Sequence, residues 1–195
     1  MSKIEIINRA LLKLGEPPVS SLNDVAFGRS YDMVYEDMKK LLLSSYPWRF
    51  AVGAKKLSKC EEMYGKKAMY RLPSDCLLLL KVFEARAPQI SGTHFEVLTG
   101  YEVVNDCIVT DILDGVCVEY VREIDDDRLF PALFREALSA KIAAELSMRL
   151  KHSITFKQAF DNEFYNFIRQ AELNNEISKD VEVLGDNSWV LVKKG

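Results

Sequence analysis

The chain has 195 residues, of which 48% are hydrophobic and 28% are charged, a composition typical of a folded protein with one compact core or one core and a large insertion. A formal net charge of -3 argues against a protein whose main task is gripping nucleic acid, since that grip comes from Lys and Arg beside phosphates. The first residues, MSKIEIINR, lack the apolar region of a signal peptide, and no apolar run approaches the ~20 residues that span a bilayer. We therefore expect a soluble protein made in the cytoplasm, without a membrane partner.

Two amphipathic helices are expected at the start of the chain. The first covers residues 3–14, where apolar residues recur every three or four positions, and Gly15 follows at the place of a left-handed C-cap. The second covers residues 24–45, with Asn23 or Asp24 available to cap its free N–H groups.

The segment LGEPPVSSLND joins these two helices and contains Pro17 and Pro18. A proline-rich ligand would need a repeated P-x-x-P pattern, whereas this segment has a single pair of prolines. The pattern favours a rigid corner between the helices.

Trp48 lies at the end of the second helix, in YPWRFA, directly after Pro47. The residue before a proline is kept out of the helical region, so the helix is expected to end there. Tyr46 and Trp48 could stack on a base or ligand, but the favoured interpretation is that Trp48 packs beneath the junction of helix and strand.

The middle of the chain, residues 48–125, has the pattern of short antiparallel strands. Segments rich in Val, Ile, Phe and Tyr are separated there by Gly, Pro, Asn and Asp. The segments are FAVGAKKL, AMYRLP, CLLLLKVFE, HFEVLTG, YEVVN, DCIVTD and VCVEYVRE. YEVVN and DCIVTD are expected to pair as a hairpin.

Two further helices are expected over residues 129–151 and 154–179. In the first, large apolar residues recur every four positions beside a strip of alanines, which lets another helix approach closely. The connection KHS is short, so the two helices are expected to form an antiparallel pair.

The last residues, VEVLGDNSWVLVKKG, contain a turn signal at GDNS and the apolar residues Trp189, Leu191 and Val192. This stretch is too short to bury its own apolar side chains. Two alternatives remain open: it adds an edge strand to the sheet of its own chain, or it docks on a neighbouring protein.

Together these elements predict an α+β protein, an antiparallel helical bundle of four main helices with a small, mostly antiparallel β insertion in the middle. The expected parts are the helical bundle (residues 1–47 plus 126–181), the β-rich insertion (48–125) and an extended C-terminal arm (182–195).

The sequence offers little reactive chemistry. His94 and His152 lack any metal-ligand spacing, and Ser74 in LPSDC is better explained as part of a β-turn than as a nucleophile. The acidic run at residues 123–128 lacks the pattern of a calcium loop and more plausibly caps the following helix.

The four cysteines and the glycines add no cofactor signal. The cysteines form no C-x-x-C pair and are expected to be buried free thiols, and neither G-x-G-x-x-G nor a P-loop occurs. We therefore expect no catalytic residues, no cofactor and no metal, and a protein that works by interaction rather than catalysis.

Several segments, taken in order, resemble the tail tubular protein A family, the head-to-tail adaptors of short-tailed, T7-like bacteriophages. INRALLKLGEPPVSSLND is similar to the opening of the family, and YPWRFA to its aromatic exit from the second helix. YRLPSDCLLLLKV, FEVLTGYEVVNDC and FPALFREALSAKIAAELSMRL are similar to a strand, a hairpin segment and the long third helix. The resemblance covers about residues 4–177, and the order and spacing of the segments carry it.

The resemblance implies a structural virion protein without catalytic residues. Such adaptors form a twelvefold ring between the portal and the tail nozzle, around the channel through which DNA leaves the head. It implies that the partners are other copies of the chain, the portal protein and the nozzle protein, that DNA passes without specific recognition, and that the protein lies in the virion tail after synthesis in the host cytoplasm. The residues expected at interfaces are Trp189, Leu191, Val192, Pro17, Pro18 and Trp48.

Two other functions compete with this one. The chain could be a non-catalytic protein-binding module, bacterial or prophage-derived, whose β domain holds a partner, or a small enzyme with an unrecognised site. The basic residues Lys55, Lys56, Lys66 and Lys67 could touch passing DNA, although a solvated face explains them more simply.

Overall fold

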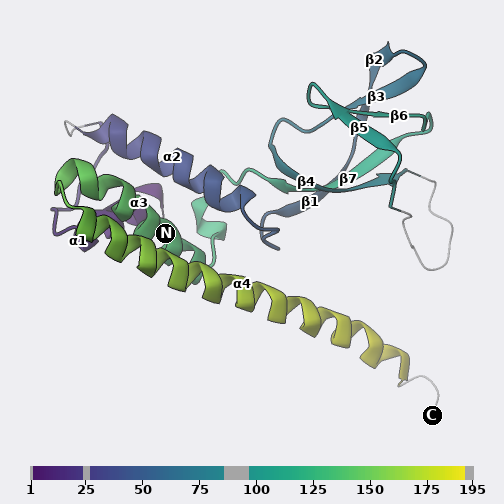
Figure 1. Ribbon diagram of the computed structural model, residues 1–195. Coiled ribbons are helices and arrows are strands. Elements are labelled where there is room, and N and C mark those ends of the chain that lie inside the picture. Colours follow the sequence, from purple (N-terminus) through teal and green to yellow (C-terminus); the bar gives the residue numbers. More distant parts are fainter. Residues whose placement is uncertain (1, 24–26, 86–96, 192–195) are drawn as a thin grey trace. The chain divides into compact units, whose positions relative to one another are not determined.

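The computed structural model describes residues 2–23, 27–85 and 97–191, and for residues 62–63 and 178–191 it describes the backbone alone (Figure 1). The chain divides into two compact units, a helical unit of residues 1–42 and 124–195 and a β-rich unit of residues 43–123. The boundaries expected from the sequence lay at residues 47/48 and 125/126.

In the described part of the helical unit there are four α-helices and a short 3-10 helix. They are α1 (Lys3–Lys13), α2 (Gly28–Ser44), η1 (Asp127–Leu129), α3 (Ala132–Leu150) and α4 (Ile154–Leu191). At the start of α1 the Ser2 N–H donates to the Glu5 carboxylate at 2.7 Å. After α1, Gly15 adopts a φ of 69°, which confirms the expected left-handed C-cap.

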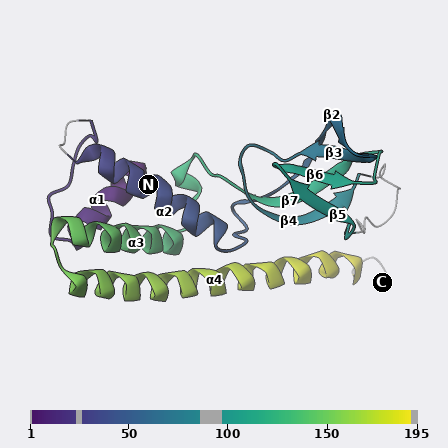
Figure 2. The same cartoon turned by 45° about the horizontal axis from the view of Figure 1, so that its top comes forward.

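Helices α3 and α4 form the antiparallel pair that the short KHS connection predicted (Figure 2). Lys141 bonds Asp161 at 2.9 Å, and Lys157 bonds Glu145 at 3.0 Å. From the first pair to the second, the residue number rises by four on α3 and falls by four on α4, so the two helices run in opposite directions. These ion pairs flank an apolar interface to which α4 contributes the buried Phe160, Ile168 and Ala171.

Helix α1 packs on the other side of α3 and supplies the second layer of the core. The fully buried side chains of these two helices include Ile6, Ile7 and Leu11 of α1, with Phe134, Leu138, Ile142 and Leu146 of α3. Arg9 and Lys13 of α1 pair with Glu136 of α3, and Lys13 also reaches Glu163 of α4 at 2.5 Å. Charged side chains thus rim the buried apolar layer.

A charge cluster ties α1 to α2. The Lys3 ammonium lies 2.5 Å from the Asp32 carboxylate and 2.6 Å from that of Glu36, and Lys39 lies 2.7 Å from the other Glu36 oxygen. The Lys39 side chain is only 6% exposed, so Glu36 is the group that compensates its buried charge. Both ammonium groups also face the ring of Tyr35, at 5.0 and 5.7 Å from its centroid.

Tyr35 joins α2 to the segment that precedes α3. Its ring is fully buried, and its hydroxyl donates to the Asp127 carboxylate at 2.5 Å. Burial and the hydrogen bond to Asp127 raise the pKa of Tyr35 well above its ordinary value, so the hydroxyl remains a donor at any working pH.

Helix α4 is longer than the sequence suggested. We expected a helix over residues 154–179 and an extended arm over 182–195, but the helix continues to Leu191. The arm is therefore wrong for residues 182–191, and Val192 lies outside the described residues. The physical reason is that one Gly within GDNS costs a helix only about 1 kcal/mol, which a long helix tolerates.

The β-rich unit contains two antiparallel sheets (Figures 1 and 2). The three-stranded sheet has the order β1 (Val52–Lys56), β7 (Val116–Arg122), β4 (Cys76–Glu84). The four-stranded sheet has the order β2 (Ser58–Tyr64), β3 (Lys67–Arg71), β6 (Cys107–Thr110), β5 (Tyr101–Val104). Strands β5 and β6 form the expected hairpin, with Val104 opposite Cys107. Asn105 and Asp106 have φ values of 47° and 58°, as a two-residue turn between twisted strands requires.

The prediction of a helical bundle with a small β insertion is wrong. The seven strands form a unit with a core of its own, made of Leu57, Ala68, Tyr70, Val82, Ile108, Val116, Val118 and Tyr120. The sequence did not predict β2, because SKCEEMY carries charged residues in place of a regular alternation of apolar and polar residues. It also could not give the pairings β1–β7 and β3–β6, which join strands far apart in the chain.

Among the glycines of this unit that the structure describes, Gly115 has the least room for a side chain. Its φ is 127°, and an added Cβ would lie 3.3 Å from the Ala85 Cβ and 3.2 Å from the Lys56 Cε. We expect Gly115→Ala to reduce the free energy of unfolding of the β-rich unit by about 1–2 kcal/mol, through backbone strain and crowding. Urea unfolding followed by fluorescence, in a Trp189→Phe chain whose one tryptophan is Trp48, measures this. Gly53→Ala is the matched control, since its Cβ would only contact Arg122 Cδ at 3.6 Å, and an equal loss there would contradict the explanation.

Candidate functional site

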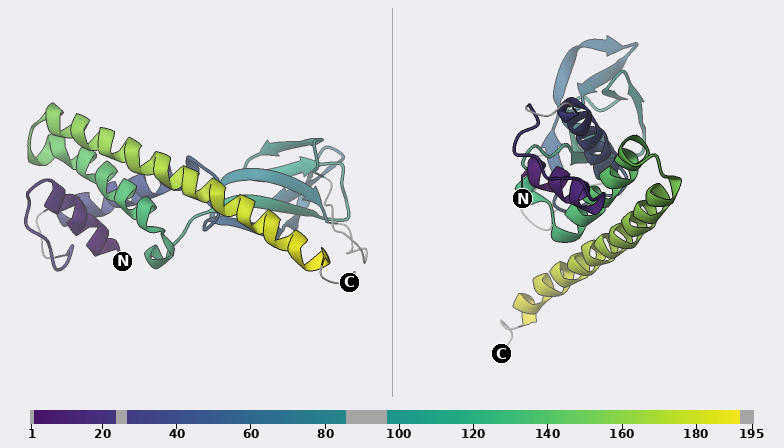
Figure 3. Two further views of the ribbon diagram at one scale, coloured as in Figure 1. Left: turned by 90° about the horizontal axis from the view of Figure 1, so that it is seen from below. Right: turned by 90° about the vertical axis from the view of Figure 1, so that its left-hand side faces the viewer.

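Helix α4 has two apolar faces, and α3 covers one of them. The covered face contains Phe160, Ile168 and Ala171, each less than a tenth exposed. Leu173 and Ile177 lie beyond this stretch, are 57% and 61% exposed, and stand four residues apart on one side of the helix. Figure 3 shows α4 continuing past the end of α3. We call Leu173 and Ile177 the exposed face of α4.

The sequence continues the spacing of this face. Val181, Leu184 and Leu191 follow Ile177 at intervals of four, three and seven residues, and the backbone is helical through Leu191. At 3.6 residues per turn, these positions fall within one stripe, on the side of the helix away from Ile168 and Ala171.

Other helices also expose large apolar side chains, but singly. Examples are Leu12 on α1 at 61%, Met33 and Leu41 on α2 at 66% and 50%, and Met148 on α3 at 42%. Isolated apolar residues are common on protein surfaces and need no partner to explain them. The exposed face of α4 is therefore the strongest candidate for a site of interaction among the described residues.

The structure separates the residues that the sequence proposed for an interface. Pro17 and Pro18 are exposed. Trp189 and Leu191 belong to the helical end of α4, where only the backbone is described, and Val192 lies outside the described residues.

Trp48 has to be removed from the interface, because its side chain is only 2% exposed. Its ring lies 4.9 Å from that of Tyr46 and 6.1 Å from that of Phe50, and the N–H groups of Ala51 and Val52 donate to its carbonyl. The favoured interpretation, packing at the junction of helix and strand, is confirmed.

The proline segment is a clamped corner. Asn8 of α1 holds Val19 on both sides, since its amide nitrogen donates to the Val19 carbonyl at 2.9 Å and its oxygen accepts from the Val19 N–H at 2.8 Å. These two bonds fix the chain just after Pro17 and Pro18, which confirms the rigid corner. The exposed proline rings are thus presented in a fixed position.

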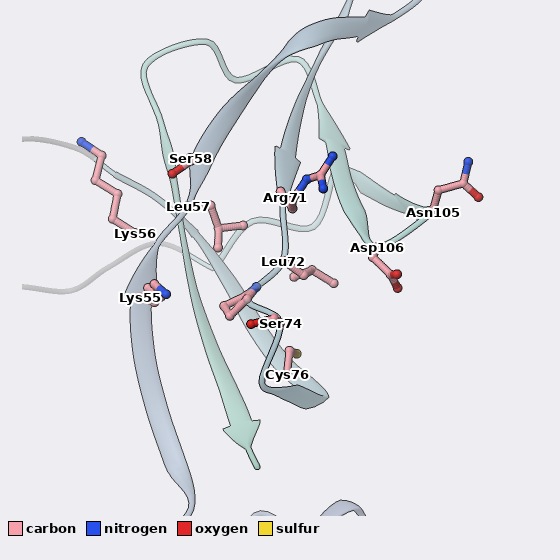
Figure 4. A pocket seen from close by; sticks show the side chains of 11 residues that line it. Lys55, Lys56, Leu57, Ser58, Arg71, Leu72, Ser74, Cys76, Asn105 and Asp106 are labelled. Atoms are coloured by element: carbon pink, nitrogen blue, oxygen red, sulfur yellow. The ribbon is translucent and has the colours of Figure 1, made fainter. Parts of the chain in front are cut away.

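A cavity of about 620 Å³ lies in the β-rich unit (Figure 4). Its lining brings together the cations Lys55, Lys56 and Arg71 with the carboxylate of Asp106. Lys66 and Lys67 do not line it, and Lys67 pairs instead with Glu102 at 3.4 Å. The three cations outnumber the one carboxylate, so the lining has a formal net charge of +2.

The nucleophiles in this lining are not activated. Ser74 lies in a turn, closed by the bond from the Cys76 N–H to the Pro73 carbonyl at 3.0 Å, as the sequence predicted. The neighbouring Asp75 carboxylate accepts from the Tyr120 hydroxyl at 3.3 Å. Burial, aided by Asp75, raises the pKa of the Cys76 thiol, which disfavours the reactive thiolate.

The acidic run and the histidines were the other candidates for chemistry, and those that the structure describes lie in turns and caps. Asp126 accepts from the Arg128 N–H at 3.1 Å, so the acidic run caps η1 rather than α3. His152 occupies the α3–α4 turn with a φ of 50°, and His94 lies outside the described residues.

Within residues 2–23, 27–85 and 97–191, no group of three or more His, Cys, Asp or Glu side chains is placed to hold a metal ion. In the same part of the chain, no helix has the length and apolar character needed to cross a membrane.

Comparison of the chain with known protein-family models and with curated proteins finds no match. The order of its sequence segments and the surfaces that its fold exposes are therefore the features that bear on its function.

Proposed function

We propose that this protein is a structural virion component, the head-to-tail adaptor of a short-tailed bacteriophage. In this role about twelve copies form a ring between the portal and the tail nozzle, around the channel through which DNA leaves the head. The proposal starts from the resemblance of five segments, in order, to the tail tubular protein A family.

The exposed face of α4 carries the proposal on the structural side. A subunit of a ring needs surfaces that its own core does not cover, because each copy must bury area against its neighbours or its ring of partners. Leu173 and Ile177 provide such a surface, and the sequence extends it toward residue 191. Neighbouring large apolar side chains that are more than half exposed favour contact with another protein.

The charge of the chain agrees with passage of DNA without capture. With a formal net charge of -3, the subunit has no general excess of cations to hold phosphates. On this proposal the partners are other copies of the chain, the portal protein and the nozzle protein, and the protein resides in the virion tail.

The direct test is assembly on a portal. The purified chain is mixed with the portal protein of the same phage, and the mixture is examined by electron microscopy. We expect rings of the chain stacked on the portal at one end. A monomer in isolation does not decide the matter, since a portal can template the ring, whereas no complex at high concentrations of both proteins rejects the proposal.

A double substitution tests the exposed face of α4. Leu173→Glu with Ile177→Glu places two carboxylates on this face, and we expect at least a tenfold loss of affinity for the assembled complex, because burying unpaired charges is unfavourable. Sedimentation of the chain with the portal measures binding. Far-ultraviolet circular dichroism should show unchanged helix content, since both side chains are more than half exposed.

The matched control is Asn175→Glu, a half-exposed polar position on the same helix that is two residues from both Leu173 and Ile177 and so lies on the opposite side. It should assemble as the unchanged chain does. Normal assembly of the double variant would remove α4 from the interface, and weakened assembly of the control would show that added charge alone is responsible.

The alternative is a non-catalytic protein-binding module, bacterial or prophage-derived. The observation that favours it is the core of the β-rich unit, whose buried residues all come from residues 57–120 of that unit. Capture of a partner by the isolated residues 43–123, together with no ring on a portal, would support this alternative over the adaptor.

A further inference from the structure

Two of the four free thiols lie close together on the four-stranded sheet. Cys60 on β2 and Cys107 on β6 have their sulfur atoms 4.0 Å apart, although β3 lies between their strands in the sheet. A disulfide bond is about 2.0 Å long and joins residues whose Cα atoms lie within about 7 Å, whereas strands on either side of a third are about 10 Å apart. Bonding therefore requires the sulfurs to approach by roughly 2 Å and the backbone of one strand to move toward the other. We propose that Cys60 and Cys107 are a site of intramolecular disulfide formation, with a small-molecule disulfide as the oxidant.

The backbone around Cys60 has room for this approach. Strand β2 is an edge strand, and its ladder with β3 shifts register between Lys59 and Met63. Cys60 lies inside this irregularity, where the strand can move without breaking a regular pair of ladder bonds. Cys107 is held in register opposite Arg71 and Val104, so β2 is the strand that moves.

The surroundings determine which sulfur reacts first. Cys60 is half-buried, whereas Cys107 is only 6% exposed, and both line a cavity of about 450 Å³ together with Lys59 and Arg71. Burial, and then the adjacent Cys60 thiol, raise the pKa of the Cys107 thiol, which makes it the poorer initial nucleophile. An oxidant therefore meets Cys60 first, and Cys107 resolves the product from inside.

The chemistry balances with one molecule of oxidant, for example oxidised glutathione. The Cys60 thiolate attacks one sulfur of the oxidant, forms a mixed disulfide and expels one glutathione thiolate. The Cys107 sulfur then attacks the Cys60 sulfur and expels the second glutathione thiolate. Two protein thiols are oxidised, one disulfide is reduced to two glutathione molecules, and the two thiol protons pass to the leaving thiolates.

The other two cysteines are natural controls. Cys76 lies opposite Arg122 at one end of the β4–β7 ladder, and Cys117 lies opposite Phe83 toward the other end. Several ladder positions separate them, so they cannot bond to each other within one folded chain.

The bond would fasten the edge strand β2 to the interior strand β6 and close the chain between residues 60 and 107. Edge strands are the part of a sheet most open to unwanted pairing, so the link protects this edge. Its timing rests on the proposed function: thiols stay reduced in the cytoplasm where an adaptor is made, and the released particle meets oxidising conditions.

The experiment uses the whole reduced chain and no portal, so its outcome is separate from that of the proposed function. The chain is exposed to oxidised glutathione, quenched with a thiol-blocking reagent, and analysed by intact mass and peptide mapping. We expect a monomer that has lost two of its four titratable thiols, with the peptides containing Cys60 and Cys107 joined. Four remaining thiols, a bond to Cys76 or Cys117, or a bond between chains would overturn the proposal.

Single substitutions test the order of the steps. Cys107→Ser should stop the reaction at a mixed disulfide, with one glutathionyl group on Cys60, and Cys60→Ser should leave Cys107 unmodified. Cys117→Ser is the matched control and should still form the Cys60–Cys107 bond. A glutathionyl group that accumulates on Cys107 in the Cys60→Ser variant would contradict the assigned order, and circular dichroism checks that each variant is folded.

Discussion

Replacing Phe134 by alanine is expected to reduce the free energy of unfolding of the helical unit by about 3–5 kcal/mol, the range typical of a fully buried aromatic side chain. Phe134 is completely buried on α3, and its ring lies 4.9 Å from that of Phe130. The substitution removes this contact and leaves a cavity in the layer between α3 and its neighbours. Urea unfolding followed by far-ultraviolet circular dichroism, which reports mainly on the helices, measures the loss.

The same substitution at Phe156 is the matched control. Phe156 is 45% exposed on α4 and stacks on Phe160 at 6.1 Å, so its removal should cost no more than about 1 kcal/mol. Equal losses at both positions would show that the core of the helical unit does not lie around α3.

Replacing Glu36 by glutamine is expected to cost about 2–3 kcal/mol at neutral pH. The change removes the charge that compensates Lys39, whose side chain is 6% exposed, and one of the two carboxylates beside Lys3. Breaking a fully buried ion pair costs about 3–5 kcal/mol. The expected value here is smaller because 35% of the Glu36 side chain is in solvent, which screens the interaction.

The matched control is Glu102→Gln in the β-rich unit. Glu102 pairs with Lys67 at 3.4 Å, but both side chains are well exposed, at 63% and 38%. Surface pairs of this kind contribute about 0–1 kcal/mol. A loss at Glu36 no larger than that at Glu102 would mean that the cluster does not hold α1 to α2.

The Glu36 contribution should also depend on pH. Burial disfavours the charged form, but hydrogen bonds from Lys3 and Lys39 outweigh it, so the pKa of Glu36 lies below its ordinary value of 4.5. A carboxyl group with a lowered pKa stabilises the folded state above its unfolded pKa, and this stabilisation is lost as the pH falls through the folded pKa. The difference in free energy of unfolding between the unchanged chain and Glu36→Gln should therefore be full at neutral pH and shrink as the pH falls below 4.5 toward the folded pKa. If the difference in free energy of unfolding did not change with pH, the effect of the substitution would come from the shape of the side chain and not from its charge.

Local sequence signals located most helices and strands because their causes are local. Gly15 ends α1 by its own positive φ, and Asn105 and Asp106 form the β5–β6 turn in the same way. The apolar spacing of α3 follows from helical geometry alone, and the short KHS connection leaves little choice but an antiparallel partner. The prediction that Trp48 packs in the interior is confirmed, and its basis was local: Pro47 ends the helix, and a strand begins a few residues later.

Helix α4 shows where local signals misled. GDNS has the composition of a turn, yet the helix runs through it to Leu191, since one glycine costs little beside the rest of a long helix. The exposed face of α4 was missed for the same reason, because its spacing is only visible if residues 173–191 are taken as one helix. The signal was present in Leu173, Ile177, Val181, Leu184 and Leu191.

The sequence by itself determined that this protein contains both helices and strands, with a pair of helices toward each end of the chain and the β5–β6 hairpin between them. It also showed few residues with the spacing of a catalytic or metal site. Only the tertiary structure decided that the strands form two sheets around a separate core, that β1 pairs with β7 and β3 with β6, and that Cys60 meets Cys107 across β3. The physical reason is the range of the interactions involved. Caps, turns and helical spacing act over a few residues and are written in adjacent letters, whereas strand pairing and sulfur contacts join residues that the chain separates by about fifty positions, where many alternatives have similar local energies.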